Sequence, residues 1–350
     1  MKKILIGNRE VGGNNPCFII AELSANHGKD INIAIETIRA AKKTGADAIK
    51  LQTFTPDTIT LDVKKEEFLI NHGTLWDGKY LHELYNETYL PWEWHKELFK
   101  VAEEEGILCF SSPFDLTAVD FLETLNAPAY KIASPEILDI PLIAACAKTG
   151  KPIIISTGIA SIEDINLAVQ TCLLEGNDQI VLLKCTTSYP APIEDANLNT
   201  IPNLIETFDV IGGLSDHTLG IVAPIVSVAL GGKVIEKHFI LDRSIGGADA
   251  SFSLDKVQFK EMVDAVRDAE RSLGKISYIL KEKASALSKL ASRSLFVSKD
   301  VKEGDLLTSD NIKSIRPGNG IHPKYYNEVM GRKFLSKLEK GTPLSWNLMT

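Results

Sequence analysis

Polar side chains that could bind a substrate or move protons follow eight short apolar runs of the sequence. Two of these polar residues are lysines that lie within the apolar runs themselves: Lys50 in Ala-Ile-Lys-Leu-Gln and Lys131 in Tyr-Lys-Ile-Ala-Ser. Burying an unpaired ammonium group costs several kcal/mol, so an anionic ligand would account for both. In chain order, the polar residues of the eight runs are Glu22; Lys50 and Gln52; Ser111 and Ser112; Lys131, Ser134 and Glu136; Ser156 and Thr157; Lys184, Thr186, Thr187 and Tyr189; Ser215, Asp216 and His217; and Glu236, Lys237 and His238.

The lysines and hydroxyl groups of this set predict the kind of substrate. A phosphate and a carboxylate could be bound here by three lysines, several Ser and Thr hydroxyls and backbone N–H groups. The three lysines are Lys50, Lys131 and Lys184. We therefore expect a small, doubly anionic molecule. The sequence has no phosphate loop of GxxxxGK[ST] form, so nucleotide triphosphate chemistry has no support.

Two histidines, His217 and His238, end the last two runs. Two neutral imidazoles that converge can hold Mn²⁺, Zn²⁺ or a similar ion, and two protein ligands leave open positions for water or substrate. We expect a catalytic ion there; the alternative is two histidines with satisfied hydrogen bonds and no metal. His27 follows the first run and could help shape the site. The remaining histidines lie in surface-like segments, and we assign no catalytic role to them: His72, His82, His95 and His322.

Three acidic residues, Glu22, Glu136 and Asp249, are expected at the same face as the lysines. Carboxyl groups there can position substrate hydroxyls or water and can transfer protons. The alternative role is a structural salt bridge to the neighbouring lysines.

The order of the elements predicts a (β/α)8 barrel. Amphipathic helical patterns, with apolar residues three or four apart, fall between the apolar runs, for example at 32–43, 94–105, 164–174 and 256–273. Eight strand–helix repeats of about 250 residues are typical of this barrel, whose active site lies at the carboxyl ends of the strands. A doubly wound open sheet is the alternative, but the first strand is followed by NHGKD and not by GxGxxG. The expected strands are 17–21, 48–52, 107–111, 129–133, 152–156, 180–185, 210–214 and 234–239.

The sequence changes character after residue 275. We expect a barrel domain over 1–275, a Lys-, Ser- and Ala-rich linker over 276–291, and a small β-rich domain over 292–350, where short alternating segments are separated by Gly and Pro turns. About 60 residues make a small independent core, so this second domain should dock on another surface.

Composition excludes several classes of protein. The 350 residues are 44% hydrophobic and 24% charged with a net charge of −8, which is typical of a globular protein and disfavours a nucleic-acid binder. The N-terminal segment does not read as a signal peptide, and no apolar run is long enough to span a membrane. Five scattered cysteines predict reduced thiols in a cytoplasm.

The motifs together resemble those of the sialic acid (nonulosonic acid) synthase family. They are FIIAELSANHG, ADAIKLQTF, SSPFD, AYKIASPE, ISTGIAS, CTTSYPAP, GLSDHTLG, VIEKHFILDR and RSLFVSKDVKEGDLLTSDNIKSIRPGNGI. TLWDGKYLHELYNETYLPWEWH and SSPFD look most like the pseudaminic acid synthase branch. The resemblance implies a TIM barrel that condenses phosphoenolpyruvate with an amino sugar on a divalent metal ion, with Mn²⁺ favoured and Mg²⁺ or Co²⁺ as alternatives. It also implies an antifreeze-like (SAF) domain that lies over the partner's barrel in a homodimer.

The resemblance also implies roles for individual residues. By motif, the residues at the family's phosphoenolpyruvate positions are Lys50, Ser112, Lys131, Ser134, Ser156 and Ser215, and its metal ligands are His217 and His238. Its sugar-side and catalytic positions are Glu22, Gln52, Glu136, Tyr189 and Asp249, and Arg316 matches the arginine that reaches the partner's site.

The acceptor predicted by the resemblance is 2,4-diacetamido-2,4,6-trideoxy-β-L-altropyranose. Thr187 stands where sialic acid synthases commonly carry Asn, and the loop at Asp249 reads GGADASFS instead of a GPD form. Both departures disfavour N-acetylmannosamine. The alternatives are a legionaminic acid or N-acetylneuraminate synthase, another phosphoenolpyruvate-condensing sugar-acid synthase, or a catalytically silent sugar-phosphate binder.

Overall fold

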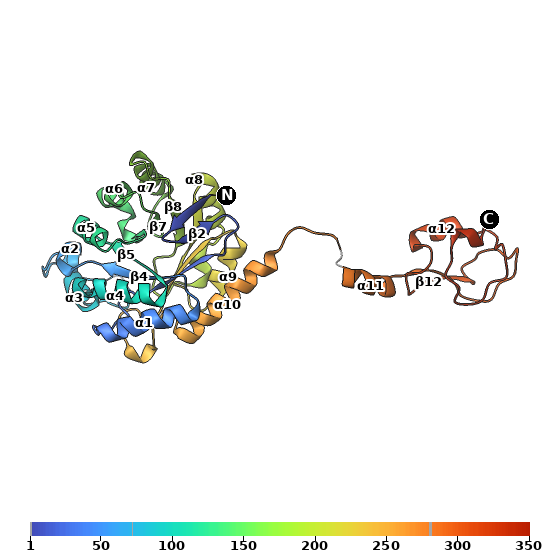
Figure 1. The fold of residues 1–350 in the computed structure, drawn as a ribbon, viewed down its shortest axis with the longest axis horizontal. Coiled ribbons are helices and arrows are strands. Elements are labelled where there is room, and N and C mark those ends of the chain that lie inside the picture. Colours follow the sequence, from blue (N-terminus) through green and yellow to red (C-terminus); the bar gives the residue numbers. More distant parts are fainter. Residues whose placement is uncertain (1, 72, 280–281) are drawn as a thin grey trace. The chain divides into compact units, whose positions relative to one another are not determined.

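The computed structural model describes residues 2–71, 73–279 and 282–350, and the chain divides into two compact units, Met1–Gly274 and Lys275–Thr350 (Figure 1). His72 and part of the expected linker lie outside the described residues. Each unit is described by itself below.

The first unit is a closed barrel of eight parallel strands in the order β10-β3-β4-β5-β6-β7-β8-β9, which confirms the predicted TIM barrel (Figure 1). Every neighbouring pair is parallel, and the barrel closes where β10 pairs with β3, with His238 opposite Glu22. The strands are β3 (Phe18–Glu22), β4 (Ala48–Thr53), β5 (Leu108–Pro113), β6 (Tyr130–Ile132), β7 (Ile153–Ser156), β8 (Ile180–Cys185), β9 (Ile211–Asp216) and β10 (Val234–His238).

Each barrel strand is followed by a helix of the outer ring, and capping residues fix where helices begin and end. Asp30 accepts a hydrogen bond from the Asn32 N–H at the start of the first ring helix, and Gly45 ends that helix with φ of 89°. The ring helices are α1 (Ile31–Thr44), α4 (Trp92–Glu105), α5 (Leu116–Thr124), α6 (Ile140–Lys148), α7 (Ile162–Leu174), α8 (Thr200–Phe208), α9 (Val222–Ala229) and α10 (Lys256–Leu273).

Side-chain alternation along the strands fills the lower barrel with apolar groups. Alternate residues of a strand face opposite sides, so every second residue points into the barrel. Phe18, Ile20, Phe110, Ile154 and Leu183 share one buried cluster inside it.

An N-terminal hairpin that the sequence analysis did not identify closes the amino end of the barrel. Its antiparallel strands are β1 (Lys3–Ile6) and β2 (Arg9–Gly12). Ile4, Ile6 and Val11 belong to the same buried cluster as the first inward residues of the barrel strands. The hairpin is therefore part of the barrel core.

The longest excursion from the barrel lies between β4 and α4. It contains α2 (Pro56–Ile59), a short 3₁₀ turn at Glu66–Phe68 and α3 (Leu81–Thr88), and an isolated antiparallel bridge joins Leu69 to Tyr80. Other 3₁₀ turns of this unit are Pro135–Leu138, Ile193–Ala196 and Arg243–Ile245.

In the described part of the second unit, β11 (Ser294–Val297) pairs antiparallel with β12 (Ile312–Ile315). Isolated bridges connect further segments, for example Phe296 with Pro343 and Phe334 with Met349. Its core includes Leu295, Val329, Phe334 and Leu344. The other elements are α11 (Glu282–Ala291), α12 (Tyr326–Val329) and 3₁₀ turns at Pro323–Tyr325 and Trp346–Leu348.

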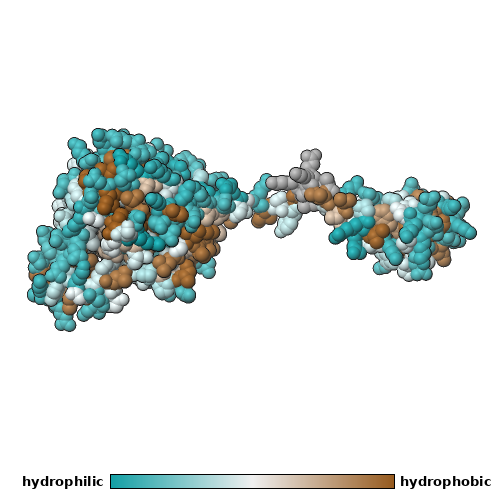
Figure 2. All heavy atoms as spheres, turned by 90° about the horizontal axis from the view of Figure 1, so that it is seen from below, coloured by the Kyte–Doolittle hydropathy of each residue, from teal (hydrophilic) through white to brown (hydrophobic). Residues whose placement is uncertain are grey.

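The visible surface of both units is mostly hydrophilic, with apolar residues in separate patches on the barrel unit (Figure 2). Exposed apolar side chains such as Leu174 on α7 and Val222 on α9 are usual on a protein surface. Among the described residues, no helix combines the length and apolar character needed to cross a bilayer.

Two neighbouring residues of β1 test whether the hairpin stabilises the barrel. Ile6 is fully buried and Leu5 is 52% exposed. We expect Ile6→Ala to lower the free energy of unfolding by about 2–5 kcal/mol, and Leu5→Ala to lower it by about 0.5 kcal/mol or less. Urea unfolding of both variants measures the difference, and equal effects would contradict the hairpin's place in the core.

Candidate functional site

Polar residues replace apolar ones at the last inward positions of the strands. The inward alternation that places Ile20, Ala48, Phe110 and Val234 in the core continues into a polar layer at the carboxyl ends. This layer, buried or nearly so, holds Glu22, Lys50, Gln52, Ser112, Lys131, Ser156, Ser215, Glu236 and His238.

Lys50 lies among three side chains of this layer. Its Nζ is 2.9 Å from Glu22 Oε2 and 3.7 Å from Glu236 Oε1, and it donates to Ser112 Oγ at 3.1 Å. Burial alone would lower the pKa of Lys50, but the two carboxylates outweigh burial and raise it. Lys50 therefore stays charged inside the barrel.

Lys131 is the second buried lysine. Its Nζ donates to Ser156 Oγ at 2.8 Å and to the Ile132 carbonyl at 2.9 Å, and it lies 3.8 Å from Glu236 Oε1. Burial lowers its pKa, with Glu236 opposing the change. The predicted third lysine, Lys184, lies on the opposite face of β8 from Leu183 and donates to the Cys185 carbonyl at 2.7 Å. Strand alternation thus removes it from the cluster.

Glu236 joins the two lysines; the sequence analysis placed it at the end of the eighth run but assigned it no role. It also accepts a hydrogen bond from Ser215 Oγ at 3.1 Å. Burial would raise its pKa, but Lys131 and Lys50 lower it below its ordinary value. Strand alternation could have predicted this position from the sequence, because Glu236 lies two residues before His238 in Val-Ile-Glu-Lys-His and therefore on the same face of the strand.

Glu22 and Asp249 are connected through a short hydrogen-bonded chain. Gln52 Nε2 donates to Glu22 Oε1 at 2.9 Å and to Ser24 Oγ at 3.0 Å, and Ser24 in turn donates to Asp249 Oδ2. The Ala25 N–H also reaches Asp249 Oδ2, at 3.3 Å. Burial raises the pKa of both Glu22 and Asp249. Ser24 is a further residue that the sequence analysis missed.

His217 and His238 lie side by side, with ring centroids 5.2 Å apart. His217 Nδ1 is 3.0 Å from the Thr186 carbonyl, so it carries the proton and Nε2 keeps a free lone pair. His238 Nδ1 is buried without a hydrogen-bond partner among the described residues and lies 3.7 Å from Asp249 Oδ2. Among the residues that the structure describes, there is no group of three or more His, Cys, Asp or Glu side chains that could hold a metal ion. The two imidazoles fit a metal with open coordination positions.

Glu136 lies on the 3₁₀ turn after β6. Burial raises its pKa to about 7, and its Oε2 has no hydrogen-bond partner in the described parts of the chain. A carboxyl group with such a pKa can donate or accept a proton near neutral pH.

Ser134 and Thr187 meet beside a glycine. Thr187 Oγ1 donates to Ser134 Oγ at 3.1 Å, and Ser134 Oγ also accepts from the Ile159 N–H at 3.1 Å. A Cβ at Gly158 would lie 2.2 Å from Thr187 Oγ1, so only glycine permits this close approach.

Aromatic rings border the histidines. The Tyr189 ring is 4.5 Å from that of His217, 5.3 Å from Phe252 and 5.8 Å from Trp76. Phe252 is also 5.0 Å from His238. Burial raises the pKa of Tyr189, so its hydroxyl stays protonated.

Two other histidines are buried. His27 is 1% exposed, and its Nδ1 accepts from the Lys29 N–H at 3.1 Å. The assignment of His95 to a surface-like segment was wrong: it is fully buried on α4, 2.9 Å from Thr53 Oγ1 and 3.2 Å from the Pro91 carbonyl. Burial lowers its pKa to about 4, so the ring is neutral. His95 lies on the buried face of α4 together with Leu98 and Ala102, and its polar side chain made this position look exposed in the sequence.

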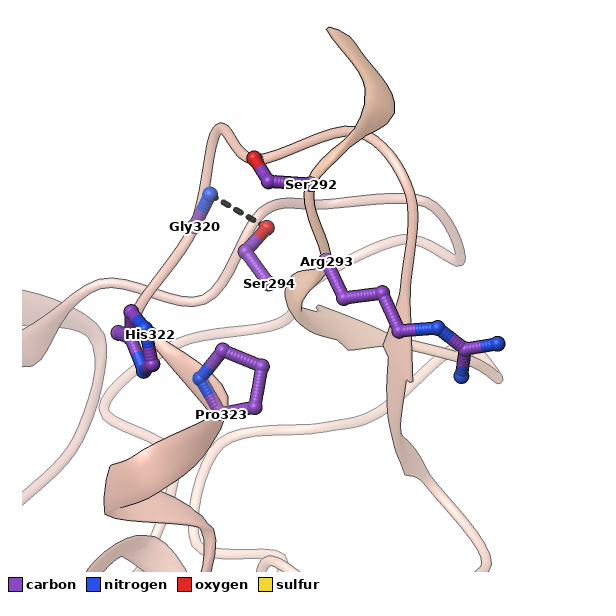
Figure 3. Close-up of a pocket in the computed structure, with 7 residues that line it drawn as sticks. Ser292, Arg293, Ser294, Gly320, His322 and Pro323 are labelled. Carbon is purple, nitrogen blue, oxygen red and sulfur yellow. Dashed lines mark hydrogen bonds between the residues drawn. The ribbon is translucent and has the colours of Figure 1, made fainter. Parts of the chain in front are cut away.

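Arg316 is exposed in the second unit, and a closely packed turn follows it. The Gly320 N–H donates to Ser294 Oγ at 2.8 Å (Figure 3). Ser294 Oγ in turn donates to the Pro317 carbonyl at 2.7 Å. A Cβ at Gly318 would lie 2.1 Å from Ser292 Oγ. The turn borders a cavity of about 340 Å³, which is lined by Ser292, Arg293, Ser294, Gly318, Gly320, His322 and Pro323.

Glu136→Gln should change stability in a pH-dependent way. Because the folded-state pKa of Glu136 is raised, the folded protein holds this proton more tightly, and its contribution to stability is lost as the pH rises through about 7. At about pH 8 we expect the free energy of unfolding of Glu136→Gln to exceed that of the wild type by about 1–3 kcal/mol. We expect this difference to vanish near about pH 4, where Glu136 is protonated in both states. Urea unfolding at both pH values measures it, and a gain independent of pH would contradict the burial of this charge.

Comparison with known proteins places this chain in a family. Residues 37–278, more than half of the chain, match the NeuB family, and residues 292–348 match the SAF domain. A pseudaminic acid synthase of Campylobacter jejuni is 50% identical over 93% of this chain and 95% of its own length. An N,N'-diacetyllegionaminic acid synthase of Legionella pneumophila is 37% identical over 97% and 98%.

A solved structure agrees with these matches. The spore coat polysaccharide biosynthesis protein SpsE of Bacillus subtilis matches with a TM-score of 0.68 and 32% identity, covering 100% of this chain and 99% of that one. The barrel and the small second unit thus have the fold of a known kind of protein, and this chain belongs to the NeuB family.

Proposed function

We propose that this chain is a pseudaminic acid synthase, which condenses phosphoenolpyruvate with 2,4-diacetamido-2,4,6-trideoxy-β-L-altropyranose and releases phosphate. The observation that carries the reaction type is the cluster of Lys50 and Lys131 beside two imidazoles in one barrel mouth. The acceptor is supported by the 50% identity to a pseudaminic acid synthase, against 37% to the legionaminic acid synthase.

The buried lysines hold phosphoenolpyruvate in this proposal. Its phosphate and carboxylate carry the negative charge that Lys50 and Lys131 can pair with, and hydroxyl groups provide the remaining donors. The hydroxyls we assign to this role are those of Ser112, Ser134, Ser156 and Ser215. Three of them already donate or accept hydrogen bonds within the cluster, at Lys50, Lys131 and Glu236. Burial strengthens such interactions because little water screens them.

His217 and His238 would hold a divalent metal ion. We favour Mn²⁺ because the family resemblance implies it, and Mg²⁺ or Co²⁺ are alternatives. Two imidazoles leave the remaining coordination positions to oxygen atoms of water or substrate, which are the ligands that suit Mn²⁺. The free Nε2 of His217 and the unpartnered Nδ1 of His238 support this assignment. When bound, such an ion supplies Lewis-acid polarisation of the sugar aldehyde.

The bond changes follow from the two substrates. Carbon 3 of phosphoenolpyruvate forms a bond to the aldehyde carbon of the open-chain sugar, and the aldehyde oxygen becomes a hydroxyl by taking up a proton. Water then adds to carbon 2, the bond between carbon 2 and the phosphate oxygen breaks, and carbon 2 becomes a ketone while phosphate leaves. In the net reaction the two water protons end on the former aldehyde oxygen and on the phosphate. Glu136, with a pKa of about 7, is suited to proton transfer near the reacting carbons. Glu22 and Asp249 would position sugar hydroxyls or water, with Gln52, Thr187 and Tyr189 on the sugar side.

The second unit would complete the site of another copy. We propose a catalytic domain over 1–275, a linker over 276–291 and a SAF domain over 292–350 that lies over the partner's barrel in a homodimer. The guanidinium of Arg316 forms paired hydrogen bonds to oxygen atoms, which suits a sugar or acetamido group. Its exposure and the tight packing of Gly318 and Gly320 behind it support this role.

We place the reaction in the cytoplasm. All five cysteines are free thiols and buried, and cytoplasmic proteins keep their thiols reduced.

Phosphate release from phosphoenolpyruvate with Mn²⁺ tests the function. We expect turnover with the 2,4-diacetamido altro sugar and little with its D-manno isomer or with N-acetylmannosamine. Preference for the D-manno isomer would indicate a legionaminic acid synthase, and preference for N-acetylmannosamine a sialic acid synthase. Absence of release with all three sugars would contradict the function and leave the fold unaffected.

His238→Ala tests the metal site. Removing one of two protein ligands should weaken Mn²⁺ binding by at least about tenfold and abolish metal-dependent turnover. Isothermal titration with Mn²⁺ gives a readout that is independent of activity. His322→Ala, an exposed histidine of the second unit, is the matched control. Equal Mn²⁺ affinity of the wild type and His238→Ala, or turnover unaffected by chelators, would contradict the metal role.

A further inference from the structure

A second cavity adjoins the barrel mouth in the first unit. Its volume is about 350 Å³, and it lies between the loop after β3, the excursion that contains α3, and the loop before Asp249. The residues that line it are Ala25, Gly28, Trp76, Lys79, Leu84, Glu87, Thr88, Gly247 and Ala248.

The cavity shares two loops with the site described above. Ala25 follows Ser24, and Ala248 precedes Asp249, while Ser24 Oγ and the Ala25 N–H both donate to Asp249 Oδ2. Ala25, one of the two residues that hold Asp249 in place, therefore also borders the cavity. A substrate bound at Asp249 could extend into it.

Aromatic contacts link the cavity to the histidines by a second route. Trp76 lines the cavity, its ring is 5.8 Å from that of Tyr189, and Tyr189 is 4.5 Å from His217. Along this route two aromatic rings, those of Tyr189 and Trp76, lie between His217 and the cavity. A group that enters it must be attached some atoms away from the carbon that reacts.

Part of the lining suits an acetamido group, and the rest is polar, with an ion pair between Lys79 and Glu87. Ala25, Leu84 and Ala248 supply apolar surface that suits a methyl group. Trp76 Nε1 is buried and has no hydrogen-bond acceptor among the residues described, which is unfavourable for a donor. A small rotation of the Trp76 ring toward the cavity would bring this donor to a ligand carbonyl oxygen and remove the penalty.

We propose that this cavity binds the acetamido group on carbon 4 of the acceptor sugar. The inference rests on the proposed function and deepens it. The acetamido group on carbon 2 is attached beside the reacting aldehyde carbon, whereas the group on carbon 4 lies two carbons further along the chain. The cavity accepts the distant group, with its methyl against Ala248 and Leu84 and its carbonyl toward Trp76.

Ala248→Leu, which fills the cavity, tests the inference in the full-length enzyme with Mn²⁺. We expect the KM of the 2,4-diacetamido sugar to rise by at least about tenfold, and the KM of phosphoenolpyruvate to stay within about twofold. An analogue with a hydroxyl in place of the acetamido group on carbon 4 should lose much less, because it places no bulky group in the cavity. Ala291→Leu adds the same bulk at an exposed position of α11 and is the control.

Trp76→Phe provides a second variant that keeps the ring and removes the N–H group. It should reduce kcat/KM for the diacetamido sugar by about tenfold and leave the carbon-4 hydroxyl analogue nearly unchanged. Thermal unfolding confirms that each variant is folded. Equal losses for both sugars, or no loss for either, would overturn the subsite while turnover by the wild type still supported the proposed function. If the wild type released no phosphate with any sugar, the proposed function itself would fail; titration of both sugars would still report on the cavity.

Discussion

The structure depends on two lysine ammonium groups held inside a protein barrel. Lys50 and Lys131 are 3% and 1% exposed, where an unpaired charge would be strongly destabilising. Glu236 lies within 4 Å of both, and Glu22 pairs with Lys50. These carboxylates make the charged lysines tolerable before a substrate arrives. Because the lysines are already desolvated and oriented, a dianion bound as we propose would meet fixed positive charge without reorganising water.

The apolar layer below makes this arrangement rigid. Phe110, Ile154 and Leu183 fill the barrel interior, and Ile6 of the hairpin closes its amino end. Close packing leaves the polar layer nowhere to relax toward that end. The pairing register of the strands therefore fixes which side chains meet at the carboxyl ends. For example, Glu22 of β3 lies opposite Lys50 of β4 and His238 of β10.

Much of this site could be predicted from the sequence, because it follows from strand positions. The lysines inside apolar runs and the two histidines at strand ends require only the alternation of side chains and the closure of the barrel. The prediction for Lys184 was wrong because a shift of one residue along a strand moves a side chain to the opposite face. The prediction for His95 was wrong because the sequence pattern did not show that this residue lies on the buried face of its helix. The roles of Glu236 and Ser24 depend on contacts across strands that no local pattern records. The hairpin is too short to show a clear alternation.

One strand shows how structural and functional charges differ. On β10, Lys237 points away from the barrel interior and pairs with Asp216, and its Nζ also donates to the Thr218 carbonyl at 2.7 Å. The Thr218 N–H in turn donates to Asp216 Oδ1 at 3.0 Å, so this buried pair is satisfied by the protein alone. The residues on either side, Glu236 and His238, keep buried atoms without hydrogen-bond partners in the described chain. The same fold thus pairs Lys237 with two protein acceptors but leaves these atoms of its neighbours unpaired in the described chain. Their unused hydrogen-bonding capacity therefore indicates that something other than the protein completes them.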